Sequence, residues 1–106
     1  MKLEMEKWWK QAEIDLKSAK NSFKSKDYYV SSFLTQQSVE KVLKALYIKK
    51  FYELIKTHDL VFLATKLKLP ERLVELCDRL SKVYVLSRYP DASEKYLLKL
   101  FLKKIP

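Results

Sequence analysis

Two short polar segments hold the side chains of this sequence that are best suited to chemistry. Residues 56–60 read Lys-Thr-His-Asp-Leu and contain the single histidine, while residues 88–91 read Arg-Tyr-Pro-Asp. An imidazole exchanges protons near neutral pH, and a guanidinium can bind two phosphate oxygens at once. Both segments stand where a helix is expected to begin, and helix starts favour anions. We therefore expect Lys56, His58 and Arg88 to surround a bound phosphate.

The same segments also have structural explanations, which the sequence leaves open. Thr57, Asp59 and Asp91 suit helix capping, and a lone histidine at a helix start is often a structural hydrogen-bonding residue. Arg88 suits a fixed ion pair as well as phosphate binding.

A third polar segment interrupts the apolar stripe of a long helix, at Gln36, Gln37 and Glu40. Buried polar groups need hydrogen-bond partners. These side chains therefore either face solvent between two apolar patches or line a groove or subunit interface. In the second case we assign Tyr89 and Asp91 to the same groove or interface.

The chain contains no glycine. Loops that cradle phosphates need glycine because their backbone adopts positive φ and comes close to the ligand. A Walker loop, a dinucleotide-binding fingerprint and the Gly-Ser opening of a nucleotidyltransferase site are therefore excluded. Cys77 stands alone, which excludes an intrachain disulfide and a paired-cysteine metal site. We predict neither a bound metal nor a cofactor.

The net charge is +9, from 22 Lys and Arg residues against 13 Asp and Glu residues. This balance permits binding to nucleic acid or to an acidic partner. A lysine-rich solvated surface is the alternative, because the lysines are spread along the chain. No apolar run reaches the length of a membrane span, and the N-terminus does not resemble a signal peptide. We expect a cytoplasmic protein with no membrane partner.

Apolar residues recur every three or four positions along most of the chain, which indicates amphipathic helices. The predicted helices cover residues 3–24, 28–53, 58–67, 71–87 and 92–104. Because the connections are short, we predict a single antiparallel all-α bundle over residues 1–106.

Capping residues mark the expected helix starts. Asp27, Thr57 and Asp91 are suitable N-caps, and Pro70 suits the start of the fourth helix. The last predicted helix is apolar on several sides, which favours burial against a second subunit. We therefore predict a homodimer.

The order and spacing of the three polar segments resemble the HEPN domain, a small helical module of bacteria and archaea. The resemblance extends from Trp8 to about Leu100. It implies a four-helix up-and-down core with one additional short helix. HEPN modules are often encoded beside a minimal nucleotidyltransferase, so the resemblance implies such a partner, in a pair of toxin–antitoxin type.

Many HEPN domains are metal-independent ribonucleases whose motif is an arginine followed a few residues later by a histidine. Arg88 stands at the arginine position, but Ser93, Glu94 and Lys95 occupy the positions expected for histidine. This departure removes the proton-transfer group. The resemblance therefore favours a non-catalytic module that binds nucleotide or nucleic acid and acts with a separate nucleotidyltransferase. A diverged ribonuclease and a helical protein-interaction scaffold are the alternatives.

Overall fold

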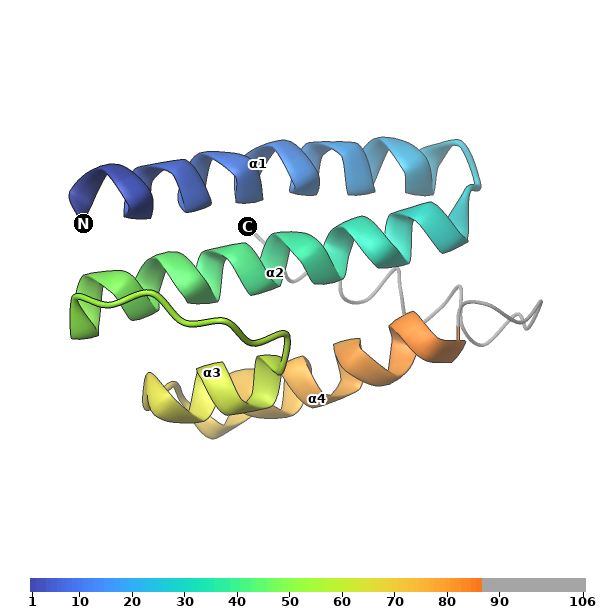
Figure 1. Cartoon of the computed structure of the whole chain (residues 1–106). Coiled ribbons are helices and arrows are strands. Elements are labelled where there is room, and N and C mark those ends of the chain that lie inside the picture. Colours follow the sequence, from blue (N-terminus) through green and yellow to red (C-terminus); the bar gives the residue numbers. More distant parts are fainter. Residues whose placement is uncertain (87–106) are drawn as a thin grey trace.

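The computed structural model describes residues 1–86, and within this range the chain forms helices and no strand. The helices are α1 (Lys2–Lys24), α2 (Tyr28–Phe51), α3 (Leu60–Lys66) and α4 (Glu71–Leu86), as Figure 1 shows. The predicted all-α bundle is confirmed. The last predicted helix, at residues 92–104, lies outside the described residues, as do Arg88, Tyr89 and Asp91. None of the helices within residues 1–86 is both long and apolar enough to cross a membrane.

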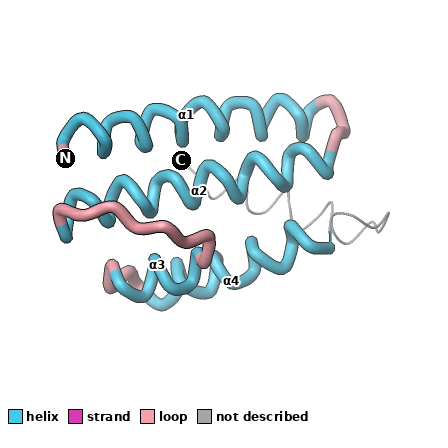
Figure 2. The backbone as a smooth tube through the Cα atoms, viewed as in Figure 1, coloured by secondary structure: helices cyan, strands magenta, loops and turns pink. Residues whose placement is uncertain are grey.

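α2 is the central helix of the bundle. It runs antiparallel to α1 on one side and packs against α3 and α4 on another (Figure 1). Residues 52–59 form the loop that leads from the end of α2 to the start of α3 (Figure 2). Among the described residues, the backbone of α1 approaches closely only that of α2. Any site that draws on both sides of the bundle is therefore built on α2.

Small side chains allow α1 and α2 to approach closely. The Ser31 hydroxyl donates a hydrogen bond to the Ala19 carbonyl, and the Ser38 hydroxyl donates one to the Ala12 carbonyl, each at 2.7 Å. The two alanines and the two serines have the same spacing along their helices, so the contact repeats. All four residues are buried. Apolar periodicity alone does not identify the two serines as buried positions.

The main hydrophobic core is formed by α2, α3 and α4, with Ala19 of α1 at its edge. Its buried members are Ala19, Leu43, Tyr47, Leu60, Leu63, Ala64, Leu67, Cys77 and Leu80. Burial raises the pKa of the Cys77 thiol to about 11. The thiol is therefore protonated at neutral pH and is a poor nucleophile, because the thiolate is the reactive form.

Most predicted helix starts agree with the structure, but the start of α3 was predicted wrongly. The Asp27 carboxylate accepts a hydrogen bond from Val30 N and caps α2, as expected. α3 begins at Leu60, and its N-cap is Asp59 rather than Thr57. The Thr57 hydroxyl instead accepts a hydrogen bond from Asp59 N at 3.2 Å. Threonine makes such local turns as readily as it caps helices, so the two roles look alike in sequence.

Candidate functional site

A cleft beside α2 brings two of the predicted phosphate ligands together. It lies between α1, the second half of α2 and the loop 52–59, and its volume is about 400 Å³. We call it the histidine cleft. Its lining residues are Trp8, Lys44, Ile48, Leu54, Ile55, Lys56, Thr57 and His58. A concave site with a mainly apolar wall and a few polar groups is typical of small-ligand binding sites.

The loop that forms one wall of the histidine cleft is anchored at its beginning by a buried tyrosine. The Tyr47 hydroxyl donates a hydrogen bond to Glu53 at 3.1 Å. Desolvation and this hydrogen bond raise the pKa of Tyr47, which keeps the phenol protonated as a donor. This hydrogen bond holds Glu53, in the first part of the loop, against the last turns of α2.

The single histidine anchors the end of the same loop. His58 Nδ1 lies 3.0 and 3.1 Å from the two carboxylate oxygens of Glu40. The Glu40 side chain is 5% exposed, whereas that of His58 is 87% exposed. A carboxylate can only accept, so Nδ1 carries the hydrogen of this bond. In the neutral imidazole the outer nitrogen, Nε2, then holds a free lone pair.

A buried lysine balances the charge of Glu40. Lys44 Nζ lies 3.2 Å from the Glu40 carboxylate and 5.1 Å from the centre of the Trp8 ring. The face of an indole attracts a cation, which adds to the ion pair. Glu40 is therefore a shared acceptor, with Lys44 on one side and His58 on the other.

A second buried ion pair lies between α1 and α2. Lys41 pairs with Asp15, and Gln11 donates a hydrogen bond to Asp15 at 3.1 Å. Asp15 is 6% exposed overall, so its charge depends on these partners. Asp15 was not among the predicted site residues. The polar segment of α2 therefore extends to Lys41, which pairs with a charged residue of α1.

The structure places each described member of the predicted site. Lys56 and His58 both line the histidine cleft. Glu40 lies behind His58 as its hydrogen-bond partner. Gln36 and Gln37 are half-buried, and the Gln36 side-chain oxygen has no hydrogen-bond partner among the described residues.

The start of α3 is capped by a side chain of the chain itself. The Asp59 carboxylate accepts a hydrogen bond from Phe62 N at 3.0 Å. The Phe62 N–H group at the start of α3 is therefore already bonded to a carboxylate of the chain itself. Phosphate binding in the histidine cleft would depend on side chains.

Trp8 and Lys44 belong to the cleft but were not predicted as site residues. Lys44 follows Glu40 by four positions, which is the spacing of a helical ion pair, and this signal could have identified it. Trp8 could not be identified in this way, because its contact with Lys44 joins two helices.

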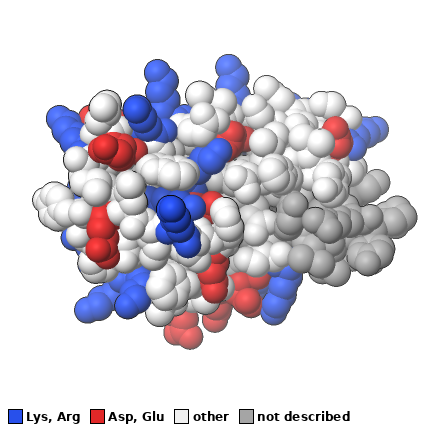
Figure 3. Space-filling model, viewed as in Figure 1, with Lys and Arg blue, Asp and Glu red and all other residues white. Residues whose placement is uncertain are grey.

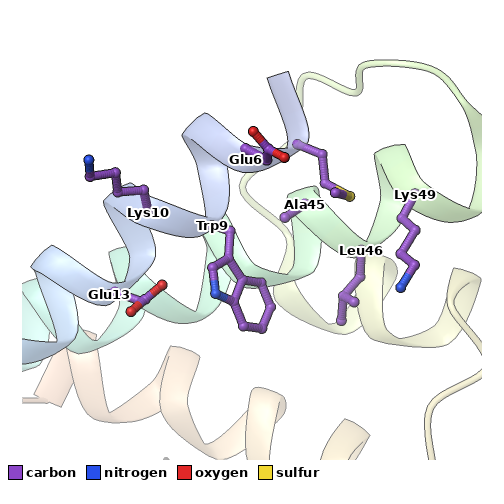
Figure 4. Close-up of a pocket in the computed structure, with 8 residues that line it drawn as sticks. Glu6, Trp9, Lys10, Glu13, Ala45, Leu46 and Lys49 are labelled. Carbon is purple, nitrogen blue, oxygen red and sulfur yellow. The ribbon is translucent and has the colours of Figure 1, made fainter. Parts of the chain in front are cut away.

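Other surface features of the described residues offer no comparable chemistry. A hollow of about 610 Å³ lies between α1 and α2, where the Trp9 indole extends beside Leu46 (Figure 4). In the face shown in Figure 3, basic and acidic side chains are interspersed rather than separated. Within residues 1–86, no cluster of His, Cys, Asp and Glu side chains could hold a metal ion.

Both the sequence and the fold of this chain are similar to those of known proteins. The family model described as HEPN domain matches residues 5–104. The crystal structure of TT1696 from Thermus thermophilus is similar, with a TM-score of 0.72 and 28% sequence identity over 93% of each chain. A comparison with curated proteins finds no match.

Proposed function

This chain belongs to the HEPN domain family, and we propose that it is a non-catalytic module that binds a nucleotide or nucleic acid beside a separate minimal nucleotidyltransferase. Family membership supports a nucleotide- or RNA-related role. The observation that carries the proposal is the histidine cleft, in which Lys56 and His58 lie together.

The charges around the cleft favour an anionic ligand. Glu40 contributes one negative charge, while Lys44 and Lys56 each contribute a positive charge. Lys44 is engaged by Glu40, but Lys56 has no ion pair among the described residues. Lys56 is therefore available to a phosphate, and Trp8 provides an aromatic surface in the same cleft.

The nucleotidyltransferase partner is proposed because this chain lacks a feature that such chemistry requires. With no glycine, the chain has no loop that could cradle the phosphates of a substrate. A partner would supply that loop, as in pairs of toxin–antitoxin type. We also propose a homodimer, and we retain Arg88 as a second phosphate ligand on sequence grounds.

We expect Lys56→Ala to weaken the binding of ATP or a short single-stranded RNA by about tenfold or more. The loss of one charge-assisted hydrogen bond costs about 1.5–3 kcal/mol. Isothermal titration calorimetry of the folded protein measures this change. Lys17→Ala is the matched control, because Lys17 is also exposed but lies on α1 outside the cleft.

An equal loss in both variants would show that net charge alone drives binding, and would contradict the assignment of the cleft. If the unsubstituted protein binds neither ligand, the protein-interaction scaffold becomes the better explanation.

The Glu40–His58 contact is the one observation that favours a second candidate, a diverged metal-independent ribonuclease. A carboxylate-held imidazole can remove a proton from a ribose 2′-hydroxyl. Cleavage also requires a group that protonates the leaving oxygen. The chain has a single histidine, so one protomer lacks a second imidazole for that step.

We expect the purified protein alone to show no metal-independent cleavage of single-stranded RNA above background. General acid–base assistance contributes about 10²–10⁴-fold, and half of the required pair is missing. Gel electrophoresis of labelled RNA after incubation with a chelator tests this. Cleavage that disappears in His58→Ala would establish the ribonuclease instead.

A further inference from the structure

Phosphate binding leaves one property of His58 unexplained. A phosphate oxygen is an acceptor, so it needs a hydrogen-bond donor such as an ammonium group. The neutral His58 ring instead offers a lone pair at Nε2, because Nδ1 donates its hydrogen to Glu40. A lone pair cannot donate a hydrogen bond to a phosphate oxygen, but it can attack phosphorus. The side chain is also 87% exposed, so an incoming group can reach it.

We propose that Nε2 of His58 is a phosphoryl acceptor and that its donor is a small phosphoramidate. The proposal rests on the proposed phosphate-binding role of the histidine cleft and gives that site a reaction. It goes beyond that role because it requires a covalent bond to the protein.

The composition of the chain favours a phosphoramidate over a phosphoanhydride as the phosphoryl donor. Side chains can bind a nucleoside triphosphate, but transfer of its terminal phosphoryl group also requires donors that stabilise the leaving phosphates, and a chain without glycine has no loop whose backbone N–H groups would supply them. A small phosphoramidate needs no such loop. Its leaving nitrogen is already protonated, so its P–N bond breaks without further assistance.

The transfer step is balanced. The Nε2 lone pair attacks phosphorus and forms the Nε2–P bond, while the donor P–N bond breaks and its electron pair leaves on a neutral amine. Nothing is oxidised or reduced. The imidazole ring gains one positive charge, and Nδ1 keeps its hydrogen. The Glu40 carboxylate, 3.0 Å away, stabilises that positive charge.

The surrounding side chains have separate roles in this step. Glu40 is a positioning residue, because it selects Nε2 as the free nitrogen and never touches the phosphoryl group. Lys44 Nζ lies 3.2 Å from the Glu40 carboxylate and balances its negative charge. Lys56 attracts the anionic donor to the cleft.

A purely structural role for His58, as a tether between the loop 52–59 and α2, makes different predictions. A tether needs only the bond from Nδ1 to Glu40. Substitution of Glu40 would then change neither the rate of phosphorylation nor the nitrogen that is phosphorylated. The rate of phosphorylation and the position of the new N–P bond therefore distinguish a phosphoryl acceptor from a structural tether.

The full-length protein is incubated with phosphoramidate near neutral pH. Intact mass spectrometry measures the rate, and ³¹P NMR identifies the phosphorylated nitrogen. We expect one phosphoryl group, on Nε2 of His58, and none in His58→Asn. Glu40→Asp keeps the charge beside Lys44 but shortens the reach to His58. It should lower the rate about tenfold and allow modification of Nδ1, since carboxylates that orient metal-binding imidazoles in the same way contribute about 10–100-fold.

Equal rates and the same product in the unsubstituted protein and Glu40→Asp would overturn the proposal, as would a phosphoryl group on a lysine. Circular dichroism confirms that each variant is folded. If Glu40→Asp is unfolded, free N-acetylhistidine becomes the reference, and a rate no faster than that reference overturns the proposal. ATP binding by the same samples tests the proposed function separately. Binding without phosphorylation overturns only the acceptor role, whereas phosphorylation without nucleotide or RNA binding overturns only the proposed function.

Discussion

Glu40→Met is expected to lower the free energy of unfolding by about 3–5 kcal/mol. Methionine has a similar volume, so the loss does not come from a cavity. The substitution leaves the ammonium group of Lys44 buried beside Trp8 without its carboxylate partner. It also releases His58 and with it the end of the loop 52–59. Urea unfolding followed by circular dichroism measures the change.

Lys44→Met and the double substitution complete a double-mutant cycle, which measures the interaction energy between Glu40 and Lys44. Lys44→Met should cost less, because Glu40 keeps His58 as a partner. The double substitution should recover much of the stability, since replacing both members of a buried pair is often neutral. Lys82→Met is the control, because its pair with Asp78 is exposed and worth at most about 1 kcal/mol. A Glu40→Met loss no larger than this control would mean that solvent screens the buried pair.

The helices could be predicted because their signals are local. A repeat of apolar residues and a nearby cap define each helix, and α1, α2 and α4 lie within two residues of their predicted bounds. The loop 52–59 could not be predicted as well. Its end is held by the contact between Glu40 and His58, which are 18 residues apart in the sequence, so no local signal marks it.

The residues of the site could be predicted from local signals, but the contacts between them could not. Residue type alone identified Lys56 and His58 as chemical groups. The interruption of the α2 stripe identified Glu40 as a polar residue that required a partner. Neither signal joined the two, because the Glu40–His58 contact depends on how the loop returns beside α2. A sequence with a polar residue in an apolar helical stripe and a histidine in the loop that follows the helix could be expected to form such a hydrogen bond.

The buried serines show a further limit of apolar periodicity. Ser31 and Ser38 are polar by type, yet they are fully buried because their hydroxyls donate to carbonyls of α1. A pattern that counts only apolar residues treats such positions as exposed. It therefore underestimates the packed face of α2, which is covered on more than one side.

Leu63→Ala is expected to lower the free energy of unfolding by about 2–5 kcal/mol. Leu63 is fully buried in the core between α2, α3 and α4. α3 has seven residues, and a helix this short is not stable in isolation. It keeps its shape because its buried side chains are packed, so the substitution removes both the packing of one residue and support for the whole helix. The expected loss is a large fraction of the stability of a domain of this size.

Leu3→Ala is the matched control, because Leu3 is 62% exposed and the same atoms are removed. Urea unfolding should be followed by circular dichroism and by tryptophan fluorescence. Both tryptophans, Trp8 and Trp9, lie on α1, whereas Leu63 lies on α3. In a cooperative domain the two signals therefore shift together in Leu63→Ala. A loss equal to that of Leu3→Ala would show that α3 contributes little to the core. A shift in circular dichroism alone would show that α3 and its loop unfold independently, and the histidine cleft would then be only as stable as α3.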